Sequence, residues 1–261
     1  MKIIVLVKQV PDTTEMKIDK ETGTLIRTGV PTIVNPDDLA AVEEALKLKD
    51  KHGAFVHVVT MGPMQAVDMM RELYGMGVDK CTLVSDRAFA GSDTWATSNT
   101  LAKAVSLQEY DLIIAGRQAI DGDTAQVGPQ VAEKLGLPQV TYVEEICECC
   151  DGKIVVSRAY EDYSEVLEVK LPCLITTLQT MNKPRYQRVG LLWDSFKREV
   201  EVITNEQLGL DSSHTGLSGS PTQVKKTFPR EVTNSNEVLT LSAQETAQHI
   251  AKLIEPFVKG E

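Results

Sequence analysis

A chain of 261 residues, of which 42% are hydrophobic and 25% charged, can bury the core of one large or two unequal globular units. Its formal net charge is −10 and it has no basic cluster beyond Lys225 and Lys226, so we expect no nucleic-acid partner. Its longest apolar runs, such as Ile3–Val7, are far shorter than the roughly 20 residues of a membrane-spanning helix, so we expect no insertion into a membrane.

The first two thirds of the chain alternate β-branched runs with amphipathic patterns, which predicts a parallel sheet flanked by helices. The predicted strands are Lys2–Val10, Phe55–Thr60, Lys80–Ser85 and Asp111–Ala115. Helices are predicted from Asn35, which precedes Pro36 and would cap the first turn, from Met64, from Ser92 or Asp93, and from Gln126. The polar stretch Pro11–Ile33 interrupts the alternation and is predicted to form a hairpin or an excursion from the sheet.

After Gly136 the pattern favours antiparallel pairing. Asp151 and Gly152 separate two strand-like runs and predict a β-hairpin. Further strands are predicted over Glu165–Lys170 and Cys173–Leu178. We therefore expect a three-layer α/β/α sheet with a parallel core and antiparallel additions.

The composition changes again in the last quarter of the chain. Gly209–Thr222 is rich in Ser, Thr and Gly and lacks periodicity, which is typical of an extended arm, and Ala243–Val258 predicts an amphipathic helix. We therefore expect an α/β nucleotide-binding domain over residues 1–205. Residues 206–261 are expected to form an arm and helix that contact a partner subunit.

Several common sites are missing from the sequence. Gly75-Met76-Gly77 is followed by Lys80 where a dinucleotide fingerprint needs its third glycine, and the four histidines lack metal-ligand spacing. Cys147, Cys149 and Cys150 form a C-x-x-C with an extra thiol. They end a strand rather than begin a helix, which favours a structural role but leaves a redox role open. Five cysteines without a secretion signal favour reduced thiols in a cytoplasm.

The most informative segment is Gly116–Gly128, which follows a predicted strand and leads into a helix. In open α/β sheets ligands bind at the carboxyl ends of the strands, and a helix N-terminus attracts phosphate. Gly116 and Gly122 would let the backbone approach a ligand, and Gln118 and Gln126 would supply donors together with Thr124. An ordinary solvated loop has the same composition, so composition alone leaves both interpretations open.

Motifs along most of the chain resemble the electron-transfer flavoprotein β subunit. The family's landmarks appear in order as Val7–Val10, Asn35–Asp38, Ala41–Ala45, Met61–Pro63 and Gly116–Gly128, and its signature as Val156–Arg158, Glu161, Asp162, Glu165, Leu167, Pro172 and Leu174–Thr176. Tyr163 departs, because the family has glycine or an acid there. The resemblance implies an adenine nucleotide alpha hydrolase-like fold and a larger flavin-carrying α subunit as partner.

The resemblance also implies which residues contact an adenine nucleotide. These are Leu6, Asn35, Asp38, Met61, Gly116, Arg117, Gln118, Gly122, Asp123, Thr124, Ala125, Gln126 and Val127. Members that hold AMP tend to have asparagine and threonine where this chain has Ala125 and Val127. The run from Gly122 is instead similar to the electron-bifurcating branch, whose β subunit holds FAD.

Three residues at the start of a predicted helix fit a second phosphate of FAD. Thr94 and Thr97 lie on one side of its first turn, next to Asp93. The alternative is that Asp93 and Thr94 only cap the helix. The resemblance favours the phosphate role.

The implied activity is electron transfer without a catalytic side chain or a metal. FAD would take electrons from NADH and pass them to ferredoxin or flavodoxin and, through an FAD on the α subunit, to a dehydrogenase such as an acyl-CoA dehydrogenase. Arg158, Glu161 and Glu165 would be interface charges, and Val189–Phe196 is similar to the region that anchors the dehydrogenase. Two alternatives stay open: a non-bifurcating carrier with structural AMP, and a universal-stress-type ATP-binding regulator, whose phosphate loop is not visible here.

Overall fold

The computed structural model describes residues 1–12, 31–150, 152–225 and 238–259. It divides into two compact units, Met1–Lys226 and Thr227–Glu261. The predicted boundary between 205 and 206 falls inside the first unit. Most of the predicted excursion Pro11–Ile33 lies outside the described residues, and its two ends pair as the antiparallel strands β2 (Gln9–Pro11) and β3 (Thr32–Val34).

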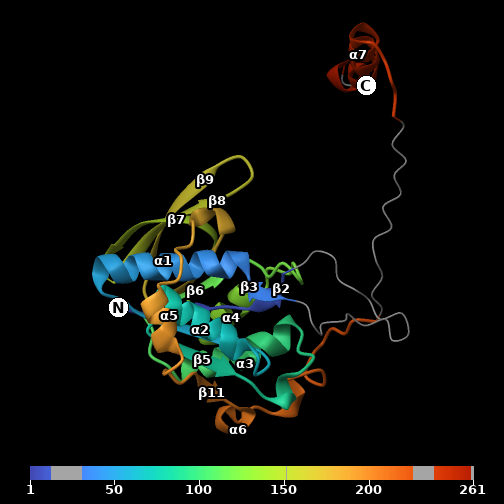
Figure 1. Cartoon of the computed structure of the whole chain (residues 1–261). Coiled ribbons are helices and arrows are strands. Elements are labelled where there is room, and N and C mark those ends of the chain that lie inside the picture. Colours follow the sequence, from blue (N-terminus) through green and yellow to red (C-terminus); the bar gives the residue numbers. More distant parts are fainter. Residues whose placement is uncertain (13–30, 151, 226–237, 260–261) are drawn as a thin grey trace. The chain divides into compact units, whose positions relative to one another are not determined.

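The first unit is built on one nine-stranded sheet with the order β11-β5-β4-β1-β6-β10-β7-β8-β9 (Figure 1). The strands are β1 (Lys2–Leu6), β4 (Phe55–Met61), β5 (Lys80–Val84), β6 (Leu112–Gly116), β7 (Gln139–Cys150), β8 (Lys153–Ala159), β9 (Ser164–Lys170), β10 (Cys173–Thr177) and β11 (Glu201–Ile203). The strands from β11 to β7 pair in parallel, and β8 and β9 are antiparallel additions, so the predicted fold class is confirmed.

Helices cover both faces of the parallel part. The main ones are α1 (Pro36–His52), α2 (Ala66–Met76), α3 (Thr94–Ser106) and α4 (Val127–Leu135). Alternation along β1 assigns the faces, because Ile3 and Val5 belong to the core cluster that contains α1 and α2 residues, whereas Ile4 and Leu6 belong to the cluster with α3 and α4 residues. The result is three layers with an apolar interface on each side of the sheet.

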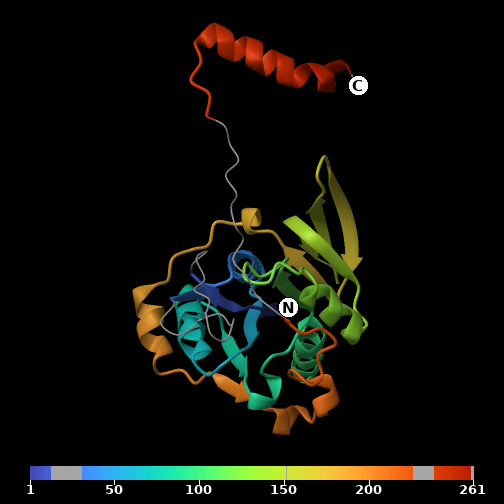
Figure 2. The ribbon, with the colours of Figure 1, turned by 90° about the vertical axis from the view of Figure 1, so that its right-hand side faces the viewer.

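Two strand predictions need correction. The predicted strand Lys2–Val10 ends at Leu6, because the Lys8 N–H turns to the Asp38 carboxylate instead of continuing a ladder. The predicted strand Cys173–Leu178 is not part of the antiparallel addition. As β10 it lies between β6 and β7 in the parallel part, while β7 to β9 project from the rest of this unit (Figure 2).

The polar segment Gly209–Thr222 folds against the start of α3 and is not an extended arm. The Asp93 carboxylate accepts hydrogen bonds from the N–H (2.9 Å) and hydroxyl (2.7 Å) of Thr222. The Ser220 hydroxyl accepts one from the Asp93 N–H at 2.8 Å, and Ser220 is buried. Side-chain to backbone hydrogen bonds thus hold a segment that has little apolar surface. The segment contains η3 (Ser212–His214), and α6 (Asn205–Leu208) directly precedes it.

The remaining elements lie on the first unit's periphery or in the second unit. They are η1 (Arg87–Phe89), η2 (Gln179–Met181), α5 (Val189–Ser195) and α7 (Ala243–Lys259). The helix α7 confirms the predicted helix Ala243–Val258. Its apolar side chains, such as Leu253 and Phe257, are exposed within the described residues. Among those residues, no helix combines the length and apolar character needed to cross a membrane.

Candidate nucleotide-binding site

The order in which the chain adds strands to the sheet reverses between β1 and β6. The chain runs from β1 through β4 to β5 on one side, and then returns to β6 on the other side of β1. Ligands of open α/β sheets bind at such a switch point, beyond the carboxyl ends of the strands. The predicted site residues Leu6, Met61 and Gly116 end β1, β4 and β6, so the structure brings them to this one edge.

Asp38 ties together the two strands that meet at the switch point. Its Oδ2 accepts a hydrogen bond from Lys8 N–H at 2.7 Å, and its Oδ1 accepts one from Gly116 N–H at 3.0 Å. Asp38 is buried, and burial raises the pKa of its carboxyl group to about 7. The geometry therefore gives Asp38 a role in fixing the backbone below the loop, rather than a surface for a ligand.

Gly116 is required by Asp38. A Cβ atom on Gly116 would lie 2.1 Å from Asp38 Oδ1, so the glycine makes room for this carboxylate. Gly128 has a similar role, because its Cβ would meet Thr176 Cγ2 at 2.7 Å. At Gly122 a Cβ would meet nothing within 4 Å. Asp38 thus explains why position 116 is glycine, and close approach of a ligand at Gly116 and Gly122 stays a prediction.

Asn35 occupies the N-cap position of α1 but does not cap the helix with its side chain. Its Nδ2 donates to the Gln118 carbonyl at 2.8 Å, and its Oδ1 accepts from Ile120 N–H at 3.0 Å. The amide thus satisfies two backbone groups of the loop after β6. The predicted cap was wrong, because the amide oxygen and nitrogen of Asn35 are used on the loop after β6 instead of on the first turn of α1.

Asp37 connects this loop to the end of β10 and to a cation. Its Oδ1 accepts from Gln179 N–H at 3.0 Å, and its Oδ2 accepts from Gln118 N–H at 3.3 Å. The same Oδ2 lies 3.4 Å from Arg117 Nε. The Arg117 backbone N–H donates to the Thr177 carbonyl at 2.9 Å, so both ends of Arg117 are held.

The loop itself is held by polar contacts and adopts an unusual backbone. Gln118 Nε2 donates to Asp123 Oδ1 at 2.9 Å, and Lys8 Nζ lies 2.6 Å from Asp121 Oδ1. Asp123 and Ala125 have positive φ angles of 48° and 52°. Gly122, the residue that the sequence offers for such a conformation, is not among the glycines with positive φ. Thr124 and Gln126 are exposed along this loop.

The start of α3 meets the start of α4 beside the loop. Thr94 Oγ1 donates to Gln126 Oε1 at 2.8 Å, and one turn further Ser98 Oγ donates to Gln130 Oε1 at 2.9 Å. Residues that are far apart in sequence, and that the sequence analysis assigned to one site, therefore lie together. Thr97 is half-buried one turn into α3.

The two helix N-termini differ in what they offer an anion. Asp93 caps α3 by accepting from Ala96 N–H at 3.0 Å, as predicted. Burial would raise the pKa of Asp93, but these hydrogen bonds and those from Thr222 outweigh it and lower the pKa. No side chain caps α4, so its first-turn amides, those of Val127 and Gly128 among them, receive no acceptor from the N-cap side chain. The N-terminus of α4 is therefore the better position for binding an anionic group.

Arg117 supplies an observation that fits an anionic ligand. Its Nε is buried and has no hydrogen-bond partner among the described residues, although the Asp37 carboxylate is near. The Arg117 side chain as a whole is 32% exposed, and a guanidinium is a natural donor to a phosphate oxygen. The residues present at this edge thus fit a phosphorylated nucleotide.

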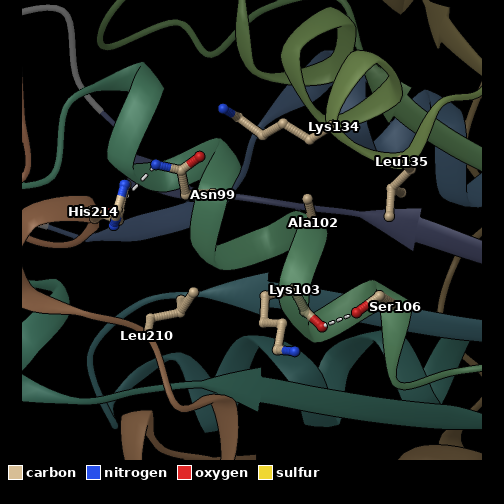
Figure 3. Close-up of a pocket in the computed structure, with 8 residues that line it drawn as sticks. All are labelled: Asn99, Ala102, Lys103, Ser106, Lys134, Leu135, Leu210 and His214. Atoms are coloured by element: carbon tan, nitrogen blue, oxygen red, sulfur yellow. Dashed lines mark hydrogen bonds between the residues drawn. The ribbon is translucent and has the colours of Figure 1, made fainter.

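The hollow that Figure 3 shows lies elsewhere, on the outer side of α3 and α4, with a volume of about 320 Å³. Lys103 and Lys134 line it, but Figure 3 shows their ammonium groups pointing in different directions. Lys134 Nζ lies 3.3 Å from the centre of the Trp95 ring. Because its polar groups do not converge on one point, this hollow is not a second nucleotide site.

The thiols and histidines form no centre of their own. Cys147 and Cys149 lie along the end of β7 as free cysteines, with Cys147 exposed, and the neighbouring Cys150 Sγ donates to Glu148 Oε1 at 3.1 Å. Burial raises the pKa of the Cys149 thiol. No group of His, Cys, Asp and Glu side chains suited to a metal ion occurs among the described residues.

The fold and the edge described above define an α/β protein of the nucleotide-binding class. A family model described as an electron transfer flavoprotein domain matches residues 22–207. Over 250 residues the chain is 50% identical to the electron transfer flavoprotein subunit beta of Clostridium acetobutylicum, covering 96% of both chains. It is 51% identical over 242 residues to the caffeyl-CoA reductase-Etf complex subunit CarD of Acetobacterium woodii, covering 92% of both.

A third relative, protein FixA of Azorhizobium caulinodans, is 42% identical over 265 residues and is matched over 94% of its length. The chain belongs to the electron transfer flavoprotein family, as a beta subunit. The resemblance stated from the motifs is thereby confirmed at the level of the family.

Proposed function

We propose that this chain is the nucleotide-binding subunit of a heterodimeric electron-transfer flavoprotein and that it holds FAD at the carboxyl edge of β1, β4 and β6. The observation that carries this proposal is the hydrogen bond between Thr94 and Gln126, which joins the N-termini of α3 and α4 at the switch point. A dinucleotide needs more than one anchoring point for its two phosphates. The uncapped start of α4 would supply one, and the Thr94 and Thr97 hydroxyls of α3, whose first turn Asp93 already caps, would supply the other.

The chain's own residues would bind and orient the cofactor. The uncapped first-turn amides of α4 and the guanidinium of Arg117 suit the phosphate groups, while Leu6 and Met61 offer apolar contact at the strand ends. When bound, the flavin supplies the redox chemistry, so no acid–base pair is required from the protein. Asn35, Asp37 and Asp38 hold the loop in place and need not touch the ligand.

The names of the relatives support electron bifurcation. CarD belongs to a caffeyl-CoA reductase-Etf complex, and a further relative, 46% identical over 236 residues, is the acryloyl-CoA reductase electron transfer subunit gamma of Anaerotignum propionicum. By analogy we propose NADH as electron donor, ferredoxin or flavodoxin as one acceptor, and an acyl-CoA dehydrogenase or reductase as the other, reached through an FAD on an α subunit.

Two exposed surfaces of the chain suit these partners. The apolar side chains of α7 have no partner within the described residues, which fits a helix that docks on the α subunit. The charges of Arg158, Glu161 and Glu165 lie on the β8–β9 hairpin, a second place for that contact. On α5, Trp193 is 71% exposed and suits an anchor for the dehydrogenase.

The test is co-expression with an α subunit, followed by flavin quantitation and reduction by NADH. We expect two FAD per heterodimer, reduction by NADH, and electron delivery to ferredoxin only when the dehydrogenase's substrate is also present. One FAD with AMP in this subunit would instead support a non-bifurcating carrier. A homodimer that retains ATP and no flavin would support the ATP-binding regulator. Either result would overturn the proposal.

A further inference from the structure

Three residues other than glycine have positive φ angles within the described chain, and all three lie at the candidate site's edge of the sheet. Two of them, Asp123 and Ala125, belong to the loop after β6. The third is Tyr142 in β7, with φ of 60°. Aspartate tolerates this left-handed region, but for a bulky aromatic residue it is a strained conformation. Strain of this kind collects at functional sites, where the surrounding structure imposes it.

A β-bulge fixes the backbone of Tyr142. Between the pairs Ile175 with Val140 and Thr177 with Val143, strand β7 uses one more residue than β10. Tyr142 N–H donates to Thr176 Oγ1 at 3.2 Å instead of to a ladder carbonyl. The left-handed position of a bulge is normally occupied by glycine, and a bulge redirects the side chain that it carries.

The redirected side chain contacts Arg117. The guanidinium carbon of Arg117 lies 5.8 Å from the centre of the Tyr142 ring, and Asp37 Oδ2 lies 3.4 Å from Nε of the same guanidinium. Tyr142 is 38% exposed, so it is not a core residue whose packing would explain the strain. Its contact with the cation at the start of the nucleotide loop is the specific feature that the strained backbone provides.

We propose that Tyr142 is a positioning residue of the nucleotide site: its strained backbone places the phenol ring against Arg117 and so fixes the guanidinium where it meets an anionic group of the nucleotide. This inference rests on the proposed function, because it takes a phosphorylated nucleotide to be the ligand. It adds a residue that lies outside the loop and helix starts, two strands away from β6 in the sheet.

The experiment compares Tyr142→Phe, Tyr142→Asn and Arg117→Ala, with the double variant, in heterodimers stripped of nucleotide and titrated with FAD and with AMP. Asparagine tolerates positive φ but lacks a ring, whereas phenylalanine keeps the ring. We expect Tyr142→Asn to weaken nucleotide binding by about two- to fivefold, the range of one cation–π contact. Its unfolding temperature without nucleotide should be equal to or above that of the wild type, and Tyr142→Phe should bind like the wild type.

The double variant supplies the decisive comparison. In the Arg117→Ala background, Tyr142→Asn should cause no further loss, because a residue that acts through Arg117 has no effect in its absence. Unchanged affinity in Tyr142→Asn, an additive loss in the double variant, or a marked fall in the unfolding temperature would each overturn the inference. Failure of the wild-type heterodimer to bind either nucleotide would overturn the proposed function itself.

Discussion

The backbone N–H of Gly116 donates to Asp38 Oδ1 at 3.0 Å, and a Cβ atom on Gly116 would lie only 2.1 Å from that oxygen. Because the glycine and the carboxylate share this space, Gly116→Ala must move either a buried charge or the end of β6. We expect the free energy of unfolding to fall by about 2 to 4 kcal/mol, as for overpacked core sites. Urea unfolding measures it.

The matched control is Gly122→Ala in the same loop. Its added Cβ meets nothing within 4 Å and its φ is outside the positive range. We expect its free energy of unfolding to stay within about 0.5 kcal/mol of the wild type, as for unconstrained surface positions. Equal losses of unfolding free energy in Gly116→Ala and Gly122→Ala would show that the loop backbone, and not the contact with Asp38, determines the destabilisation.

The buried carboxyl group of Asp38 predicts a pH dependence of stability. Burial raises its pKa from 3.8 to about 7 in the folded state. The folded protein therefore holds more protons between these values than the unfolded chain, so this group favours folding below about pH 4 and loses that contribution as the pH rises through about 7. In Asp38→Asn this pH dependence of the free energy of unfolding should be missing. The variant should also lose a constant amount of stability at every pH, because one acceptor oxygen is replaced.

Urea unfolding of both proteins across this pH range checks the prediction. The difference in their free energies of unfolding should change most between the two pKa values, by up to about 1.4 kcal/mol per pH unit. Parallel curves for the two proteins would contradict it, and would mean that the N–H donors of Lys8 and Gly116 keep Asp38 ionised.

Much of the fold follows from local sequence, and the exceptions share a physical cause. The strands β4, β5 and β6 have β-branched runs whose buried pattern needs no distant partner to be recognised. The end of β1 depends on Asp38, a residue 30 positions away that withdraws the Lys8 N–H from the ladder. In the same way, Gly209–Thr222 has no periodicity, and its hydrogen bonds to Ser92, Asp93 and Asn99 hold it against α3.

The sequence predicted which residues form the site but not the role of each residue in it. The loop after β6 and the start of α3 were expected to meet, and the contact of Thr94 with Gln126 is consistent with that. Asn35 and Asp38 are predicted ligands whose polar atoms the structure uses on backbone groups. Tyr142 could not be found, because a tyrosine in a strand-like run gives no indication of positive φ.

Thr94 tests whether the two helix starts act together on the nucleotide. Thr94→Val removes the hydroxyl that donates to Gln126. We expect nucleotide affinity to fall several-fold, because Gln126 and the start of α4 lose a fixed neighbour, while the free energy of unfolding falls by no more than about 1.5 kcal/mol. Isothermal titration with FAD measures the affinity.

The matched variant Thr97→Val separates two roles in this helix. If Thr97 binds a phosphate, as predicted, its loss should also weaken the binding of FAD. The binding of AMP should be unaffected, because AMP has a single phosphate. Equal affinities of Thr97→Val and wild type for FAD would remove Thr97 from the site. Unchanged FAD affinity in Thr94→Val would contradict the joint action of the helix starts.

Neighbouring residues of α5 separate recognition of a dehydrogenase from packing. Trp193 is largely exposed, whereas the Cβ of Leu192 lies 3.3 Å from the position that a Cβ on Gly75 of α2 would take. We expect Trp193→Ala to slow electron delivery to the dehydrogenase with flavin content and unfolding temperature unchanged. Leu192→Ala should lower the unfolding temperature. Equal electron delivery in Trp193→Ala and wild type would exclude this surface from recognition.

The second compact unit predicts where the α subunit gains affinity. The helix α7 exposes Leu253 and Phe257 on its apolar side, and burying each such side chain is worth about 1.5 to 3 kcal/mol. Deleting residues 227–261, or replacing Leu253 by Asp in the intact helix, should therefore weaken heterodimer recovery on a tagged α subunit. The first unit keeps all its strands in both variants, so its cooperative unfolding should be unchanged. Full co-purification of the deleted form would show that α7 does not bind the α subunit. If recovery falls in the deletion but not in Leu253→Asp, the contact belongs to the rest of the second unit.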